Sequence, residues 1–112
     1  MRISSLIGTL TIPISQDKSN IIQGKELANL VALLFYNVAA YTGTVAVEVA
    51  YPDDALEAAH QALTVDGTAV ELVAATTQLV NCGGFRSIML DSDGTEGAAR
   101  AVQVVGIFDI RD

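Results

Sequence analysis

Apolar and polar residues alternate along several short segments of the chain, which is the pattern of β-strands with one buried face. Within residues 45–49, three valines alternate with Ala46 and Glu48. The same short pattern occurs three times along the chain: one residue, then Gly and Thr, and then a run of apolar or alternating residues. Gly accepts the positive φ of a tight turn, and β-branched residues favour the extended chain that follows it. The pattern predicts strands over three segments: 10–12, 45–49 and 69–73.

The last third of the chain repeats this style. Two glycines, Gly83 and Gly84, precede an apolar run over 85–90, and a turn rich in Asp and Gly follows it at 91–94. Residues 99–110 form a long run rich in Val and Ile, with Gly106 as the expected position of a β-bulge. Turn signals spaced 8–15 residues apart are typical of sandwiches and barrels. The chain is therefore predicted to be a single all-β domain over 1–112.

Two segments remain ambiguous from periodicity. Residues 27–41 hold a helical stripe of apolar positions, yet their centre, 30–36, equally fits a strand that is buried on both faces. Residues 53–62 follow Pro52, are rich in helix formers and begin with acids, so they predict a short helix or a wide loop. The fold class is thus all-β with at most one short helix.

The balance of apolar and charged residues adds a requirement for a partner. Hydrophobic residues make up 51% of the 112 residues and charged residues 17%, whereas about 25% charged is usual. This composition excludes intrinsic disorder. The segments 30–36 and 99–110 look apolar on both faces, and a two-layer sandwich covers only one face of each strand. We expect a neighbouring copy or a larger assembly to cover the other face, with Val104 as an outward contact.

Net charge and cysteine content exclude several classes of function. Six basic against thirteen acidic residues give a net charge of −7, which argues against nucleic-acid binding because no basic patch is present. The longest weakly polar run, 27–41, is shorter than the roughly 20 residues that span a bilayer, so no membrane partner is expected. A single cysteine, Cys82, permits neither an internal disulfide nor a thiolate metal cluster.

The residues that usually carry chemistry are isolated in this sequence. Asp91, Asp93 and Glu96 suggest part of a calcium loop, but the twelfth position from Asp91 is a valine where a bidentate Glu is needed, so a hairpin turn is favoured. His60 is the only histidine, and Cys82 has no basic neighbour to lower its pKa. We therefore expect no enzymatic activity, no metal and no cofactor.

Eight short motifs follow one another along nearly the whole chain. In order, they are Thr11-Ile12-Pro13, Ser19-Asn20-Ile21-Ile22, the apolar segment 30–36, the Gly-Thr segment 43–49, Asp66-Gly67-Thr68, Phe85-Arg86-Ser87-Ile88, Ser92-Asp93-Gly94 and Ala98-Ala99-Arg100. This order resembles a broad family of small virion proteins encoded in the head and tail gene modules of tailed bacteriophages. The segment 51–63 departs from the family pattern, since it lacks the Trp or Tyr that the family tends to carry before the Asp-Gly turn.

The resemblance implies a jelly-roll-like β-sandwich, a strand over 30–36 and a structural role in the virion. The acidic charge suits a head decoration (cement) protein, which bridges subunits on the outside of a capsid. The implied partners are the major capsid protein or other virion proteins, and the chain would be made in the host bacterial cytoplasm. The local three-fold axes of capsid lattices imply a homotrimer. A neck or tail adaptor, or a fibre-associated protein, is the alternative within the same class.

A different class of function rests on the tyrosines. Tyr36, Tyr41 and Tyr51 could stack on sugar rings if they shared one open face, which would make the chain a carbohydrate-binding module for host attachment. Residues 1–8 are expected to act as an interface arm. The candidate interface residues are Met1, Arg2, Ile3, Tyr36, Tyr41, Tyr51 and Val104.

Overall fold

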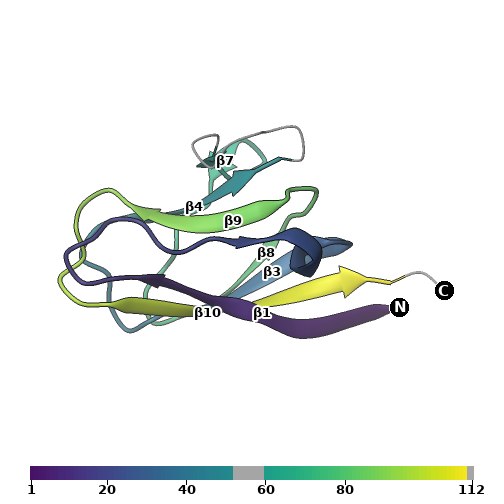
Figure 1. The fold of residues 1–112 in the computed structure, drawn as a ribbon, viewed down its shortest axis with the longest axis horizontal. Helices are drawn as coiled ribbons and strands as arrows, with labels where there is room; N and C mark the ends of the chain where they lie inside the picture. The colour runs from purple at the N-terminus through teal and green to yellow at the C-terminus, as the bar shows by residue number, and fades with distance from the viewer. Residues whose placement is uncertain (52–59, 111–112) are drawn as a thin grey trace.

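The computed structural model describes residues 1–51 and 60–110, and nearly all of its regular structure is antiparallel β-strand (Figure 1). One short 3-10 helix, η1 (Gly24–Leu27), interrupts the strands. The strands are β1 (Arg2–Ile12), β2 (Ile22–Gln23), β3 (Leu30–Tyr36), β4 (Val45–Ala50), β5 (Gln61–Ala62), β6 (Thr64–Val65), β7 (Thr68–Ala69), β8 (Thr77–Asn81), β9 (Ser87–Ser92) and β10 (Arg100–Asp109). Within the described ranges, no helix is long and apolar enough to cross a membrane.

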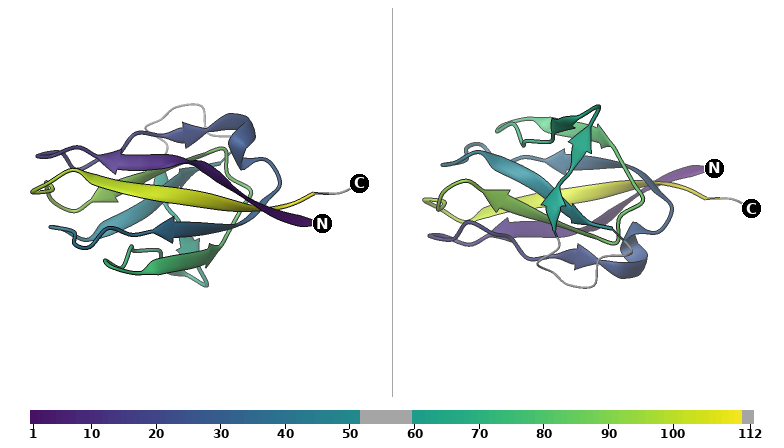
Figure 2. Two further views of the ribbon diagram at one scale, coloured as in Figure 1. Left: turned by 90° about the horizontal axis from the view of Figure 1, so that it is seen from below. Right: turned by 90° about the horizontal axis from the view of Figure 1, so that it is seen from above.

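Two four-stranded sheets pack face to face. The first sheet has the strand order β1-β10-β3-β8 and the second sheet the order β2-β9-β4-β5, while β6 and β7 form a separate hairpin (Figures 1 and 2). The chain changes sheet at each step from β1 to β4 and again from β8 to β10. This alternation between two antiparallel sheets is the connectivity of a jelly roll. The prediction of an all-β, jelly-roll-like sandwich is confirmed.

The hydrophobic core lies between the two sheets and uses alternate residues of each strand. Its fully buried members from the first sheet are Leu10, Ile12, Leu33, Phe35, Val102 and Val104, and those from the second sheet are Val45, Val47, Val49, Ile88 and Leu90. Val104 has no exposed surface, so its assignment as an outward contact is wrong. The alternation along β10 instead turns Val105 and Ile107 away from the core.

The segment 30–36, ambiguous from its sequence, forms strand β3 and pairs with β10 on one side and β8 on the other.

Gly106 was the expected bulge, but it pairs regularly with Ser5 and Leu33. The irregularity between β10 and β3 lies one step further along, between Ile107 and Phe108. The ring of Phe108 fills the space that a side chain on Gly106 would need, because a Cβ there would lie 2.6 Å from it. Gly106 is therefore a packing requirement.

The segment around Asp66 forms a tight hairpin. Asp66 and Gly67 both have positive φ, as the two-residue turns between antiparallel strands require. The strand predicted over 69–73 is shorter than expected: β7 ends at Ala69, and Glu71 makes a single bridge to Ala46 of β4. Of the helix or loop predicted over 53–62, residues 53–59 lie outside the described residues and Gln61–Ala62 forms strand β5.

The first eight residues belong to the first sheet. β1 pairs with β10 from Arg2 opposite Asp109 to Ile12 opposite Arg100, with one irregularity between Leu6 and Gly8. Met1 and Ile110 extend this ladder through two backbone hydrogen bonds, Ile110 N to Met1 O at 2.7 Å and Met1 N to Ile110 O at 3.0 Å. Figure 1 shows β1 and β10 reaching beyond the other strands, so both ends of the described chain lie at one end of the sandwich.

Candidate interaction surface

The outward side of the first sheet carries an apolar row that crosses all four strands. The pairing register aligns Leu6 of β1 with Val105 of β10, Val105 with Leu34 of β3, and Leu34 with Leu79 of β8. Leu6 is 58% exposed and Leu79 56% exposed, and the two residues between them are partly exposed. We call these four residues the apolar row. Val104, Leu33 and Phe35, which are neighbours in sequence of the two central members, point into the core, so the row lies on the opposite, outward side of the sheet.

Two further rows flank the apolar row on the same side of the sheet. On one side the register aligns Ser4, Ile107, Ala32 and Asn81, and on the other side Thr9, Gln103, Tyr36 and Thr77. We call these three rows together the outer face, which is the surface viewed in the left panel of Figure 2. None of the residues in the three rows is charged. The nearest opposite charges in the same ladder, Arg2 and Asp109, lie at the end of the strands.

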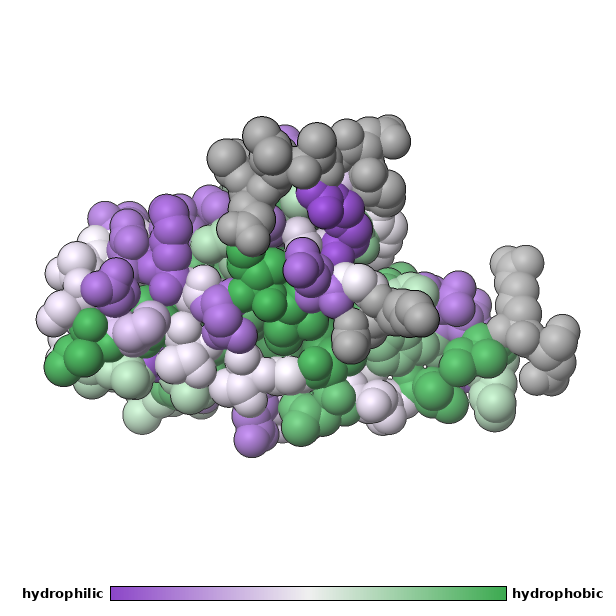
Figure 3. Space-filling model, in the orientation of Figure 1, coloured by the Kyte–Doolittle hydropathy of each residue, from purple (hydrophilic) through white to green (hydrophobic). Residues whose placement is uncertain are grey.

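The second sheet presents a polar and acidic surface. Glu48 and Asp91 lie on neighbouring strands, and Lys18 Nζ contacts Asp91 Oδ1 at 3.1 Å. Burial, together with the neighbouring Asp91 carboxylate, raises the pKa of Glu48. Figure 3 shows hydrophilic residues gathered on the upper left of the view, where the second sheet lies. The two broad sides of the sandwich therefore differ sharply in charge.

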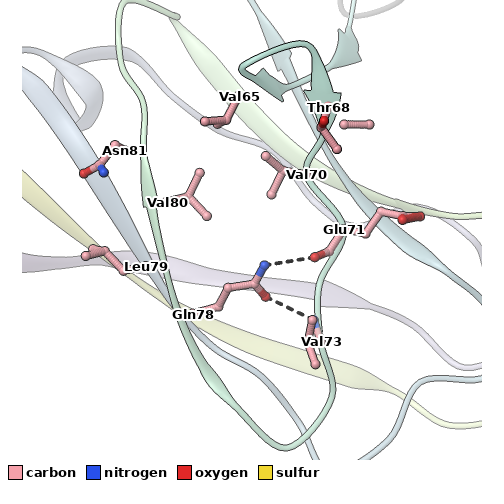
Figure 4. Close-up of a pocket in the computed structure, with 10 residues that line it drawn as sticks. Val65, Thr68, Val70, Glu71, Val73, Gln78, Leu79, Val80 and Asn81 are labelled. Atoms are coloured by element: carbon pink, nitrogen blue, oxygen red, sulfur yellow. Dashed lines mark hydrogen bonds between the residues drawn. The ribbon is translucent and has the colours of Figure 1, made fainter.

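A shallow groove of about 480 Å³ lies between the β8 edge and the segment that follows β7 (Figure 4). The Gln78 side chain crosses it, donating from Nε2 to Glu71 O at 2.9 Å and accepting from Val73 N at 3.0 Å. Asn37 Nδ2 also donates to Gln78 Oε1 at 3.1 Å. These bonds use the polar atoms of Gln78 to tie the edge strand to the loop, so the role of Gln78 here is structural.

A buried carboxylate, Glu96, joins two loops at the end of the sandwich. It accepts hydrogen bonds from Thr42 N at 2.8 Å, Gly43 N at 2.9 Å, Ser92 Oγ at 2.8 Å and Arg100 Nε at 2.9 Å. Burial alone would raise the pKa of Glu96, but these four donors outweigh it and lower the pKa to about 2. Glu96 is therefore a structural anion.

The acidic turn that suggested part of a calcium loop is organised by its own hydrogen bonds. Asp93 Oδ1 accepts from Thr44 N at 2.8 Å, and Glu96 is fully engaged as described above. Over residues 1–51 and 60–110, no group of three or more Asp, Glu, His or Cys side chains is arranged to hold a metal ion. The segment does connect two strands, but the prediction of a hairpin turn is wrong, because β9 lies in the second sheet and β10 in the first.

The three tyrosines do not share a face. Tyr36 is exposed on the outer face of the first sheet, whereas Tyr51 directly follows β4 of the second sheet. Tyr41 is half-buried against the core, and its hydroxyl donates to Asn37 Oδ1 at 2.7 Å. Burial raises the pKa of Tyr41 to about 12. No common stacking platform for a sugar ring is formed by these side chains.

The remaining candidate interface residues lie at the β1–β10 end. Met1, Arg2 and Ile3 are exposed, and Ile3 lines a groove of about 360 Å³ together with Phe108.

The apolar row was not predicted from the sequence. Its one available signal was the apolar character of both faces of 30–36 and 99–110, which did not reveal which residues point outward.

His60 and Ser87 form a contact that sequence reasoning did not anticipate, with 2.8 Å between His60 Nε2 and Ser87 Oγ. Ser87 is 1% exposed. Its hydroxyl is out of reach of a substrate, so this pair ties the residue before β5 to strand β9.

Cys82 is half-buried, and its Sγ lies 3.5 Å from Val80 O. Burial raises the pKa of the thiol to about 12 from an ordinary 9.0. We expect the folded chain to react with a thiol reagent such as DTNB at pH 8 at least about 100-fold more slowly than the urea-unfolded chain, because only the thiolate reacts. Stopped-flow absorbance measures both rates. A native rate within about tenfold of the unfolded rate would show that the thiol is accessible and ionises normally.

Comparison with known proteins supports the fold. No family model and no curated protein sequence is similar enough to this chain to count as a match. Among solved structures, the chain is similar to the SPBc2 prophage-derived protein YomS, with a TM-score of 0.60 and 10% identity over 96% of this chain and 93% of that one. It is also similar to a protein from a structure described as "Bacillus endospore appendages form a novel family of disulfide-linked pili", with a TM-score of 0.52 and 10% identity over 99% and 90% of the two chains. At this identity the likeness concerns the fold, a small all-β domain.

Proposed function

We propose that this chain is a structural protein of a bacteriophage virion, and that it decorates and stabilises the capsid. The observation that carries the proposal is the outer face, since an uncharged surface with an apolar row that crosses a whole sheet is typical of a protein that is covered by others in an assembly. The similar folds of a prophage-derived protein and of a protein from pili support an assembly role. The order of sequence motifs supports the phage context.

A decoration role matches the chemistry of the two sides of the sandwich. Capsid-binding strength in such a protein comes from many repeated interfaces of modest area, so one tight binding site is not required. The acidic second sheet, with Glu48 and Asp91, would face solvent. Its charge would keep capsids that carry the protein soluble. Contact with the shell would use the β1–β10 end, where Met1 and Ile3 are exposed.

The buried Ser87 and the high pKa of Cys82 favour a non-enzymatic role.

The test is the copy number and position of the chain on virions. We expect quantitative mass spectrometry of purified particles to find the chain at a fixed ratio to the major capsid protein, and immunogold labelling to mark the heads. Labelling of the neck or tail would instead support an adaptor or a fibre-associated protein. Absence from virions would overturn the proposal.

A variant pair tests which surface meets the shell. We expect Ile3→Asp to lower binding to capsids that lack the chain by at least about tenfold, because a charge would enter an apolar contact. Val73→Asp is the control, since Val73 is 56% exposed and lies away from the β1–β10 end. Co-sedimentation with capsids measures both. Equal binding of the two variants would show that the β1–β10 end is not the contact.

A further inference from the structure

The arrangement of the outer face is complementary to itself. Stacked sheets lie about 10 Å apart with their strands within about 30° of each other. A two-fold axis parallel to the strands, placed between two copies, reverses the strand order of one copy relative to the other. It therefore puts β1 over β8 of the second copy and β10 over β3 of the second copy.

This arrangement matches the apolar row with itself. Leu6 of one copy meets Leu79 of the other, and Val105 meets Leu34. All four side chains thereby become buried between the copies. Their removal from water supplies a driving force that is proportional to the apolar area covered.

The flanking rows match in the same way. On one side Ile107, a large residue, lies against Ala32, a small one, and Ser4 lies against Asn81. On the other side Thr9 lies against Thr77, and Gln103 lies against Tyr36. An apolar centre with a polar rim is the anatomy of a stable protein interface.

Charge favours this face over the other broad side of the sandwich for contact between copies. Each copy carries −7, so the repulsion between two copies is smallest when the touching surfaces hold no charged residues. The outer face brings no charged residue into contact. A second copy placed on the second sheet would oppose Glu48 and Asp91 to the same carboxylates of its partner. Like charges opposed at close range cost several kcal/mol.

The side of the sandwich that carries the outer face is large enough for a second copy. A standard interface buries about 800 Å² on each partner. The molecule measures 46 × 30 × 25 Å, and the side seen in the left panel of Figure 2 is bounded by the longest and the shortest of these extents. That side has room for an interface of standard size.

We propose that the outer face of the first sheet binds a second copy of this chain, with the two-fold arrangement described above. This inference deepens the proposed function by naming the partner of the outer face. It concerns the purified chain alone, so its test does not depend on where the chain sits in a virion.

The first test is the mass in solution. We expect analytical ultracentrifugation to give twice 11.7 kDa for the wild type, and a monomer for Leu79→Asp with an unchanged far-ultraviolet circular dichroism spectrum. The dissociation constant should rise at least about 100-fold, because both copies would bury an unpaired carboxylate. Val73→Asp is the matched control, since Val73 and Leu79 are both 56% exposed and only Leu79 lies on the outer face; it should remain a dimer. A wild-type monomer at high concentration, or a dimer of Leu79→Asp, would overturn the proposal.

The second test is the geometry of the pair. In a Cys82→Ser background, a mixture of Leu6→Cys and Leu79→Cys chains should be joined in pairs by a short bis-maleimide cross-linker, because facing residues of stacked sheets lie about 10 Å apart, too far for a direct disulfide. Each variant alone should not, because in this arrangement identical residues lie on opposite edges of the face. Cross-linking of Leu6→Cys chains with themselves would contradict the two-fold arrangement. A species of three times 11.7 kDa would replace it with the trimer expected from capsid symmetry.

Discussion

Replacing Val104 with Asp should remove a large part of the stability of the fold at 25 °C. Val104 has no exposed surface and lies on the central strand β10, where it pairs with Gly8 of β1 and Phe35 of β3. The substitution would bury a carboxylate with no partner and remove a core side chain. Together these effects cost more than about 4 kcal/mol, against a typical total stability of about 5–15 kcal/mol for a domain.

The adjacent residue provides the control for this prediction. Val105 points out of the core on the outer face, so Val105→Asp should keep a folded spectrum and lose only the association between copies. Far-ultraviolet circular dichroism and urea unfolding distinguish the two variants. A cooperative unfolding transition for Val104→Asp near that of the wild type would show that the alternation along β10 is assigned to the wrong faces.

Replacing Glu96 with Gln should destabilise the fold by about 3 kcal/mol or more at pH 7. The amide places an NH₂ group where one carboxylate oxygen now accepts two hydrogen bonds, either from Thr42 N and Arg100 Nε at Oε1 or from Gly43 N and Ser92 Oγ at Oε2, so a donor would face two donors. It also leaves the Arg100 guanidinium without its counter-charge. Asp93→Asn is the control, because Asp93 is exposed and accepts a hydrogen bond from Thr44 N; it should cost less than about 1 kcal/mol. Urea unfolding measures both.

The effect of Glu96 should also depend on pH. Its pKa is about 2 in the folded chain and 4.5 in the reference state, so ionised Glu96 stabilises the fold fully above about pH 5. This contribution is about 3 kcal/mol and is lost as the pH falls through 4.5 toward 2. The difference in unfolding free energy between wild type and Glu96→Gln should therefore shrink over that range. A difference that stays constant from pH 7 to pH 2.5 would exclude this linkage.

The sequence predicted those strands whose signal is local. The segment 45–49 lies within β4, and the run over 99–110 contains β10, because β-branched residues bounded by turn signals are a short-range pattern. The segment 30–36, which forms β3, was ambiguous from its periodicity. Strand β8 was missed, since its sequence, Thr-Gln-Leu-Val-Asn, is mostly polar and it lies at a sheet edge. An edge strand with one solvent-exposed face has few apolar residues, so its sequence gives only a weak alternation of apolar and polar positions.

Long-range features were not predictable in the same way. The face on which Val104 lies was assigned wrongly because β10 carries apolar residues on both sides; the polar neighbour Gln103, which is exposed, was the one local signal that turns Val104 inward. The apolar row requires the register of four strands, which places Leu6 beside residues far away in the sequence. Two of the four donors to Glu96, Thr42 N and Gly43 N, likewise lie more than fifty positions earlier. Such arrangements become visible only once the strands are paired.

The pairing of the chain's two described ends has a mechanical consequence. Met1 and Ile110 bond to each other, and β1 and β10 run antiparallel away from them. A force that pulls these two residues apart would open the ladder like a zipper, loading one pair of strand residues at a time, starting beside Arg2 and Asp109. A force applied along the strands would load many of these hydrogen bonds together. The sandwich should therefore resist stretching along its length far better than tension that separates its two ends.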